Sequence, residues 1–139
     1  MQTRRQFLFT VIAGCFCSTV SAYSLLPKID GYSSVANRLA TLLTNNDSAV
    51  SVGKTYQIFS NITSINLSFE ITTLLAYLNL SIRDFLAMNN EKLLQHIKVS
   101  IAEDFNNEHI EQVNGWLLSK TEIQLCHVLS LVSQTSLLT

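Results

Sequence analysis

A group of acidic and imidazole side chains between residues 103 and 111 is the first place in this sequence where chemistry is conceivable. Its members are Glu103, Asp104, Glu108, His109 and Glu111. Carboxylates and imidazoles bind calcium and zinc, but the run lacks the glycine and terminal glutamate of a calcium loop and the paired histidines of a zinc site. We therefore interpret it as a solvated helix end and loop, and we predict no metal site.

Two further motifs carry reactive residue types. Gly53-Lys54-Thr55 matches the end of a phosphate-binding loop, but the glycine that this loop requires five positions earlier is Ser48. Cys126 and His127 combine a nucleophile with a base, yet neighbouring residues of a helix point about 100° apart and do not face each other. His127 also has no carboxylate near it in the sequence. These motifs predict neither catalytic residues nor a bound cofactor.

The stretch from Val113 to Glu122 contains the strongest local instructions for folding. Asn114 and Gly115 suit the positive φ angles of a two-residue I′ hairpin turn between apolar arms. Ser119 and Glu122 have the spacing of a capping box, in which each side chain accepts a hydrogen bond from the other residue's N–H. A hairpin followed at once by a helix is therefore predicted. The core-facing residues of that helix recur at helical spacing: Leu125, Val128, Leu129 and Val132.

The rest of the chain alternates short amphipathic segments with polar joints. Apolar residues recur at helical spacing near residues 33–43, 47–59, 71–78, 81–86 and 89–105. Candidate caps for these helices are Ser33 or Ser34, Asp47, Ser81, and Asn89 or Asn90. Residues 61–68 are expected to form a loop. Because each apolar stripe needs a partner, we predict an all-α fold, a small antiparallel helical bundle with one short β-hairpin near the C-terminus.

Composition limits the class of protein. The chain has 139 residues, enough for one domain, and is 47% apolar and 14% charged. With a net charge of −1, the chain lacks the excess of basic residues typical of a nucleic-acid-binding protein, so nucleic acid is not an expected partner. Gly53 falls inside a predicted helix, where glycine costs roughly 0.5–1 kcal/mol relative to alanine, so close packing against a neighbour is expected there. We assign residues 1–22 to a leader and residues 23–139 to a single helical domain.

Residues 1–22 have the features of a cleaved export signal. A basic start precedes an apolar segment, and small residues before Tyr23 suit cleavage after Ala22. The basic part matches the twin-arginine pattern of a serine or threonine, two arginines, any residue and two apolar residues. The matching residues are Thr3, Arg4, Arg5, Phe7 and Leu8. The sequence thus predicts export to the periplasm by the twin-arginine route, with the general secretory route as the alternative.

The same leader contains a second processing motif. Ile12-Ala13-Gly14-Cys15 resembles a lipobox, in which the cysteine is lipidated and becomes the first residue. Under this alternative Cys15 anchors the protein in a membrane, whereas otherwise the protein meets a membrane only through its export signal. Cleavage after Ala22 leaves Cys126 as the only cysteine, so no intrachain disulfide is predicted and Cys126 is expected to be a small buried residue.

The predicted bundle has more aromatic residues than a body of this size must bury. The residues in question are Tyr32, Tyr56, Tyr77 and Trp116. Aromatic side chains left at a surface are common anchors of protein interfaces, so these residues indicate a surface for a partner. For Trp116, which lies beside the tight turn, an interface role and a place in the core are both open.

The twin-arginine leader, the segment Ser51–Tyr56 and the closing Asn-Gly-Trp-Leu-Leu-Ser-x-Thr-Glu together resemble small exported bacterial proteins of unassigned role. In size, helix plan and leader, the chain is also distantly similar to the small subunits of membrane-bound gluconate, sorbitol and fructose dehydrogenases. The motif match to those subunits covers residues 3–8. In such complexes a flavin-bearing large subunit has no leader and is carried out, already folded, by the signal of the small subunit.

This resemblance implies an exported, non-catalytic accessory or escort subunit of a periplasmic or membrane-bound oxidoreductase, with no cofactor of its own. The expected partners are the larger exported oxidoreductase subunit and the twin-arginine export machinery. The alternative is a stand-alone periplasmic helical protein with a binding or structural role, either soluble or lipid-anchored. An exported enzyme ranks third because no catalytic motif is recognisable.

Overall fold

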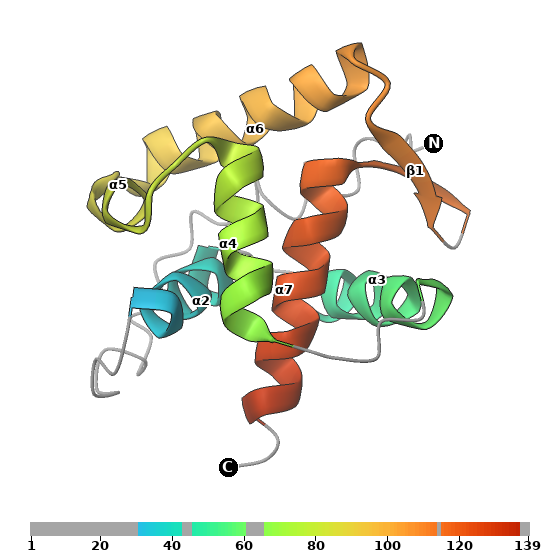
Figure 1. Ribbon diagram of the computed structural model, residues 1–139, viewed down its shortest axis with the longest axis horizontal. Coiled ribbons are helices and arrows are strands. Elements are labelled where there is room, and N and C mark those ends of the chain that lie inside the picture. The colour runs from blue at the N-terminus through green and yellow to red at the C-terminus, as the bar shows by residue number, and fades with distance from the viewer. Residues whose placement is uncertain (1–30, 43–45, 61–65, 114, 137–139) are drawn as a thin grey trace.

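One helix, α7 (Lys120–Ser136), runs through the centre of the molecule, and the other elements pack around it (Figure 1). The computed structural model describes residues 31–42, 46–60, 66–113 and 115–136. Along the chain the preceding elements are α2 (Gly31–Leu42), α3 (Asn46–Phe59), α4 (Leu67–Leu78), α5 (Ile82–Ala87), α6 (Asn90–Asn106), β1 (Ile110–Val113) and β2 (Trp116–Ser119). The predicted all-α fold with one short hairpin near the C-terminus is confirmed.

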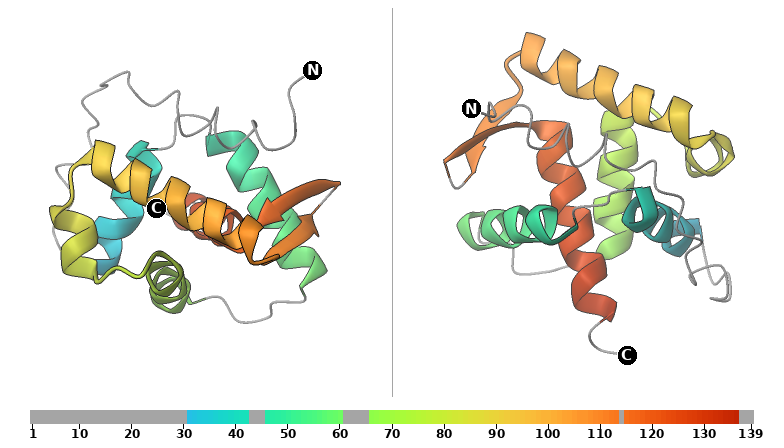
Figure 2. Two further views of the ribbon diagram at one scale, coloured as in Figure 1. Left: turned by 90° about the horizontal axis from the view of Figure 1, so that it is seen from above. Right: turned by 180° about the vertical axis from the view of Figure 1, so that it is seen from behind.

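The helices pack on α7 in two different ways. α4 lies beside α7 and runs in the opposite direction, so these two form an antiparallel pair (Figures 1 and 2). α2 and α3 lie across this pair on opposite sides, and α6 crosses over one end of it. The antiparallel arrangement is therefore clearest for α4 and α7, whereas the crossing helices close the core around them.

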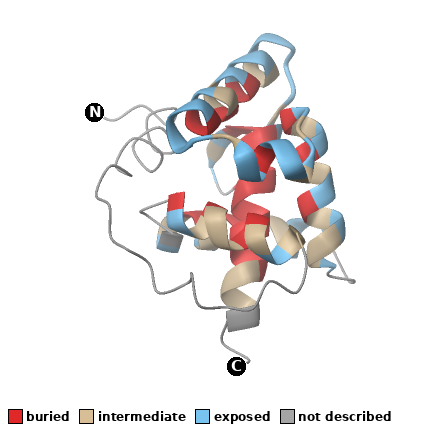
Figure 3. Ribbon diagram, turned by 90° about the vertical axis from the view of Figure 1, so that its left-hand side faces the viewer, coloured by how far each residue is buried: buried red, intermediate tan, exposed pale blue. Residues whose placement is uncertain are grey.

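α7 is buried on all sides over most of its length. Every residue from Thr121 to Leu131 is buried, and Figure 3 shows this buried segment passing through the middle of the molecule. The predicted core face is buried, except that Val132 is only half-buried. The opposite, polar face of the helix is buried as well, which the sequence pattern did not indicate. Polar groups on that face must find their partners inside the protein.

α3 approaches the backbone of α7 closely at Gly53. A Cβ atom at this position would lie 2.7 Å from the carbonyl carbon of Cys126 and closer still to its oxygen. No larger residue fits here unless the two helices separate. The expected close packing at Gly53 is confirmed, and its position in the middle of a packed helix does not suit a phosphate-binding loop.

Helix starts follow the predicted caps in part. The Ser81 hydroxyl accepts a hydrogen bond of 3.0 Å from the N–H of Asp84 at the start of α5, and the Asn89 side chain accepts one of 2.8 Å from the N–H of Lys92 at the start of α6. Both are the bonds that an N-cap residue makes.

Three helices begin earlier than the sequence pattern predicts. α2 begins at Gly31, so Ser33 and Ser34 lie inside its first turn and do not cap it. α3 begins at Asn46, which places Asp47 in the first turn, where its negative charge still interacts favourably with the helix dipole. α4 begins at Leu67, inside the stretch predicted as a loop. Its cap is Asn66, whose side chain accepts a hydrogen bond from the N–H of Phe69.

Candidate functional site

The hairpin leads directly into α7. Pairing of Val113 with Trp116 leaves a two-residue turn, in which Gly115 has a φ of +80° and Asn114 lies outside the described residues. β2 ends at Ser119 and α7 begins at the next residue. The Ser119 N–H donates to Glu122 Oε2 at 2.6 Å, and the Glu122 N–H donates to Ser119 Oγ at 3.1 Å. Both hydrogen bonds of the predicted capping box are therefore present.

Residues of α6 complete the polar contacts at the start of α7. Asp104 Oδ2 accepts hydrogen bonds from the backbone N–H of Thr121 at 2.8 Å and from its hydroxyl at 2.6 Å. The Ser100 hydroxyl lies 2.9 Å from the Thr121 hydroxyl and donates to the carbonyl of Tyr77. Asp104 thus supplies a negative charge at the positive end of the helix dipole. This member of the acidic group is a structural residue, while Glu103, Glu108 and Glu111 are exposed as predicted.

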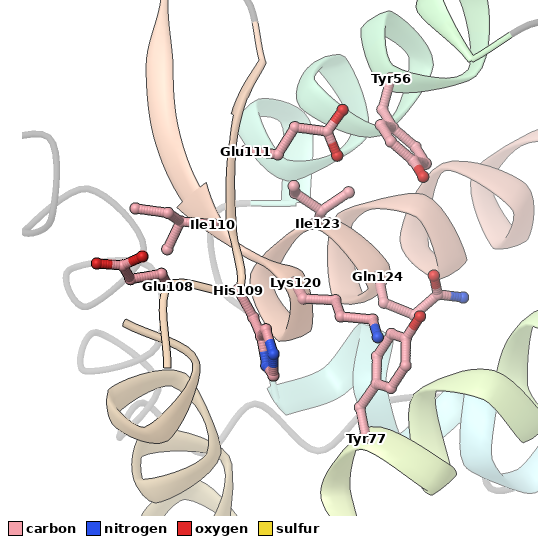
Figure 4. Close-up of a pocket in the computed structure, with 9 residues that line it drawn as sticks. All are labelled: Tyr56, Tyr77, Glu108, His109, Ile110, Glu111, Lys120, Ile123 and Gln124. Carbon is pink, nitrogen blue, oxygen red and sulfur yellow. The ribbon is translucent and has the colours of Figure 1, made fainter. Parts of the chain in front are cut away.

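A pocket opens where β1, α3, α4 and the first turns of α7 meet (Figure 4). Its volume is about 270 Å³. Tyr56 and Tyr77 supply aromatic walls, and the buried residues Ile123 and Gln124 lie between them. The Lys120 ammonium lies 4.3 Å from the centre of the Tyr77 ring, a distance suited to a cation–π contact. The other lining residues come from the connection after α6 and from β1: Glu108, His109, Ile110 and Glu111.

A histidine and a glutamate are buried together next to this pocket. His127 Nδ1 lies 3.3 Å from Glu70 Oε2, and the exposed fractions of the two side chains are 1% and 12%. The Gln124 amide donates to the same Glu70 oxygen at 2.7 Å and to the Glu70 carbonyl at 2.9 Å. No carboxylate lies near His127 in the sequence, and the packing of α4 on α7 brings Glu70 to it.

The His127 ring is poorly satisfied. Neither ring nitrogen has a hydrogen-bond partner with good geometry among the described residues, although the Glu70 carboxylate is near enough to attract it. Burial lowers the pKa of His127, and the negative charge of Glu70 opposes that shift without cancelling it. The ring is therefore held neutral. A buried imidazole without a good hydrogen-bond partner is unusual in a stable core and calls for an explanation beyond stability.

Two residues connect the pocket with the buried pair. The Tyr56 ring lines the pocket and also meets the His127 ring edge-on, with centroids 5.7 Å apart and planes at 67°. Gln124 lines the pocket and holds Glu70. A neutral imidazole beside a carboxylate is the acid–base part of many catalytic sites. With 1% exposure, however, the His127 side chain is not open to solvent, and it does not line the pocket.

Sequence reasoning missed this site, although a signal for it existed. Polar residues recur every three or four positions along α7: Lys120, Gln124, His127, Ser130 and Gln134. This polar stripe meets polar residues on the neighbouring helices. The Gln57 amide of α3, for example, donates to the Ser130 hydroxyl at 2.8 Å. A polar stripe at helical spacing usually indicates a solvated face, and here it instead lines a buried seam between α7 and its neighbours.

The predicted aromatic anchors are not free at the surface. Tyr32, Tyr56 and Trp116 are half-buried and pack against the core, and Tyr77 is half-buried beside Lys120. Trp116 is thus joined to the core on one side, and an interface role on its other side stays a prediction. The large apolar side chains that are exposed are different ones, among them Ile58, Phe59 and Phe69.

Cys126 is fully buried, as predicted. Burial, and then the negative charge of Glu122, raise the pKa of its thiol to about 12. The thiolate is the reactive form of cysteine, so this residue is not a nucleophile in the folded protein. It packs as a small apolar residue in the hydrophobic core.

The predicted export residues lie outside the described part of the chain. They are Thr3, Arg4, Arg5, Phe7, Leu8, the lipidation candidate Cys15 and the cleavage residue Ala22. Their roles stay predictions. Within the described ranges, no helix is both long enough and apolar enough to cross a membrane. In the same ranges, no three histidine, cysteine, aspartate or glutamate residues are grouped so that they could hold a metal ion.

Comparison of the chain with protein-family models, with curated proteins and with solved structures finds no match. The resemblance to dehydrogenase small subunits therefore stays a prediction.

Proposed function

We propose that the protein is an exported, non-catalytic accessory subunit that binds a larger oxidoreductase and accompanies it across the membrane by the twin-arginine route. The observation that carries this proposal is a set of exposed apolar side chains. Ile58 and Phe59 in the last turn of α3 are each 75% exposed, and Phe69 in the first turn of α4 is 65% exposed. Exposed aromatic and branched apolar residues are typical of protein interfaces.

These side chains flank one connection, the segment between α3 and α4. A partner that covers this region would bury two phenylalanines, and residues of this kind contribute much of the binding energy at interfaces. The partner is therefore expected to offer an apolar groove. The aromatic anchors of this proposal are Phe59 and Phe69, in place of the tyrosines and tryptophan considered from the sequence.

Two further observations support an accessory role. The Thr3–Leu8 motif belongs to a route for cargo that folds before it crosses the membrane, and the escort supplies that signal to a partner without one. The nearest approach to a catalytic pair, His127 with Glu70, is largely closed to solvent, and the His127 ring meets the Tyr56 ring edge-on. A binding role for the body agrees with both.

Copurification tests the interaction. Tagged protein extracted gently from periplasm and membranes should bring down a larger cofactor-bearing oxidoreductase. Phe59→Asp combined with Phe69→Asp should remove that partner, because a charge would be buried without a counter-charge. Val99→Asp is the matched control, since Val99 is 46% exposed on α6, which crosses the end of α4 opposite its first turn (Figure 1). A free monomer after gentle extraction would contradict the proposal.

Export tests the escort role. Arg4→Lys with Arg5→Lys keeps the positive charge but removes the paired arginines, so periplasmic accumulation should stop if the twin-arginine route is used. Deletion of the gene should strand the partner in the cytoplasm, and the body behind another twin-arginine leader should restore its export. Normal periplasmic dehydrogenase activities in the deletion strain would favour the alternative, a stand-alone binding or structural protein, which Cys15 would anchor if it is lipidated.

A further inference from the structure

We infer that the pocket between β1 and α7 binds a small zwitterion of the amino-acid type, whose ammonium pairs with Glu111 and whose carboxylate pairs with Lys120. This inference is independent of the escort role. It rests on two opposite charges that line one pocket of about 270 Å³ together with Tyr56, Tyr77 and Ile123.

The two charges face the same space from different elements. In Figure 4, Glu111 and Tyr56 lie on one side of Ile123, and Lys120 and Tyr77 lie on the other. Among the described residues, neither Glu111 nor Lys120 takes part in an ion pair. A ligand that carries both charges can therefore pair with both groups without breaking an existing salt bridge.

The position of Lys120 is not explained by helix stability. Lys120 is the first residue of α7, where a positive charge opposes the helix dipole. Its ammonium instead lies over the Tyr77 ring at the edge of the pocket. The aromatic ring holds the ammonium where it can pair with an anionic group. The negative charge of that group would offset the unfavourable interaction between Lys120 and the helix dipole.

The surrounding charges favour a zwitterion over a simple anion or cation. Glu111 points toward Tyr56 and Ile123 (Figure 4), so a ligand with only a carboxylate would meet its negative charge. A ligand with only an ammonium would meet Lys120. His109, the imidazole in the lining, is 59% exposed, and its Nδ1 lies 3.9 Å from Asp104 Oδ1. A ligand whose ammonium and carboxylate lie close together, as in an amino acid, carries a counter-charge for each side of the pocket.

The walls and the volume define the rest of the ligand. Tyr56, Tyr77 and Ile123 present aromatic and branched apolar surface, which suits an aromatic or branched side chain. The volume corresponds to about nine molecules of liquid water, the size of a single amino acid and less than that of a peptide. The Gln124 amide donates to Glu70, and this orientation leaves its Oε1 as an acceptor for the ligand ammonium.

The first test uses three probes with the full-length protein. L-phenylalanine has both charges, phenethylamine lacks the carboxylate, and 3-phenylpropionate lacks the ammonium. In calorimetric and NMR titrations, L-phenylalanine should bind at least about tenfold more tightly than either analogue, because each analogue loses one charge-assisted pair. Amide shifts should be largest for residues around Ile123. Equal binding of the three probes, or no binding of L-phenylalanine at millimolar concentration, would overturn the inference.

The second test assigns each charge to its partner. Lys120→Met should lower the affinity for L-phenylalanine by about tenfold and leave that for phenethylamine unchanged or improved, because only the zwitterion uses Lys120. Glu111→Gln should likewise lower the affinity for L-phenylalanine by about tenfold and leave that for 3-phenylpropionate unchanged or improved, because 3-phenylpropionate has no ammonium to pair with Glu111. Lys92→Met and Glu91→Gln are matched controls at the start of α6, far from β1, and should change nothing. If Lys120→Met weakens both ligands equally, or neither, the assignment of the carboxylate to Lys120 is wrong.

Discussion

Thr121 and His127 lie less than two turns apart on the same buried helix, and their polar atoms meet opposite conditions. The Thr121 hydroxyl and N–H both reach Asp104, and Ser100 adds a further contact. The His127 ring is as deeply buried but has no good hydrogen-bond partner among the described residues. One helix thus contains a fully satisfied polar region and an unsatisfied one.

The difference separates polar groups that stabilise the fold, such as those of Thr121, from the His127 ring, which is buried without a good partner. Buried polar groups are normally paired, because an unpaired one loses its hydration without compensation. The first turn of α7 follows this rule and anchors the hairpin and α6. The middle of α7 departs from it beside a pocket, at a place where Tyr56 and Gln124 connect the two. The well-paired polar groups and the unpaired ring therefore lie on different turns of the same helix.

The largest expected effect comes from forcing α3 away from the middle of α7. Gly53→Val should lower the free energy of unfolding by about 3 kcal/mol, because the added atoms collide with the Cys126 carbonyl and cannot be accommodated by a rotamer change. Urea unfolding measures this loss. Lys54→Val is the control at an exposed position of the same helix and should stay within about 0.5 kcal/mol of the parent. Similar midpoints for both variants would contradict the close contact.

Removal of one hydroxyl should test the satisfied region. Thr121→Val keeps the shape of the side chain but leaves Asp104 and Ser100 short of a partner, so a loss of about 1–3 kcal/mol in the free energy of unfolding is expected. Thr72→Val, at an exposed site of α4, supplies the same exchange without burial and should be close to neutral. A neutral Thr121→Val would show that the contacts with α6 do not stabilise the fold.

The capping box should contribute somewhat less. Ser119→Ala removes the acceptor for the Glu122 N–H and should cost about 0.5–2 kcal/mol. The same urea series reads this change, with Ser51→Ala as the exposed control. An unchanged midpoint for Ser119→Ala would mean that the box is present but energetically idle, and that α6 alone holds the start of α7.

The smallest effect at neutral pH is expected in the unsatisfied region. His127→Leu removes no good hydrogen bond and nearly conserves volume, so the free energy of unfolding at pH 7 should change by less than about 1.5 kcal/mol. A loss well above this, equal to that of Thr121→Val, would show that the ring is paired after all.

The pH dependence of unfolding sharpens the same comparison. Burial lowers the pKa of folded His127 below its ordinary value of 6.5, so the unfolded chain takes up the proton first. The contribution of the neutral ring is fully present above pH 6.5 and is lost as the pH falls through the lower pKa of the folded state. His127→Leu should remove this slope, whereas His109→Leu, at an exposed ring, should keep it. Parallel profiles for the parent and His127→Leu would contradict a neutral buried imidazole.

Local chemistry in the sequence determined the joint before α7 and the kind of fold. A glycine that tolerates positive φ and a serine three residues before a glutamate act through their own backbone, so Gly115 and the Ser119–Glu122 box were predictable without a partner. The same reasoning applies to the caps Ser81 and Asn89, to the buried Cys126 and to the close contact at Gly53. The helix starts at residues 31, 46 and 67 were missed, since favourable backbone geometry extends past the apolar residues that signal a helix.

Only the tertiary structure decided that the polar face of α7 is buried, that Glu70 meets His127, and that Tyr56, Tyr77, Glu111 and Lys120 surround one pocket. The periodicity of α7 shows two faces but does not show how many neighbours cover them. Coverage depends on how α3, α4 and α6 cross the helix, and crossing geometry is set by side-chain packing between residues far apart in the chain. The possible chemistry of this protein therefore lies in long-range contacts, whereas its local structure follows from residues close together in the sequence.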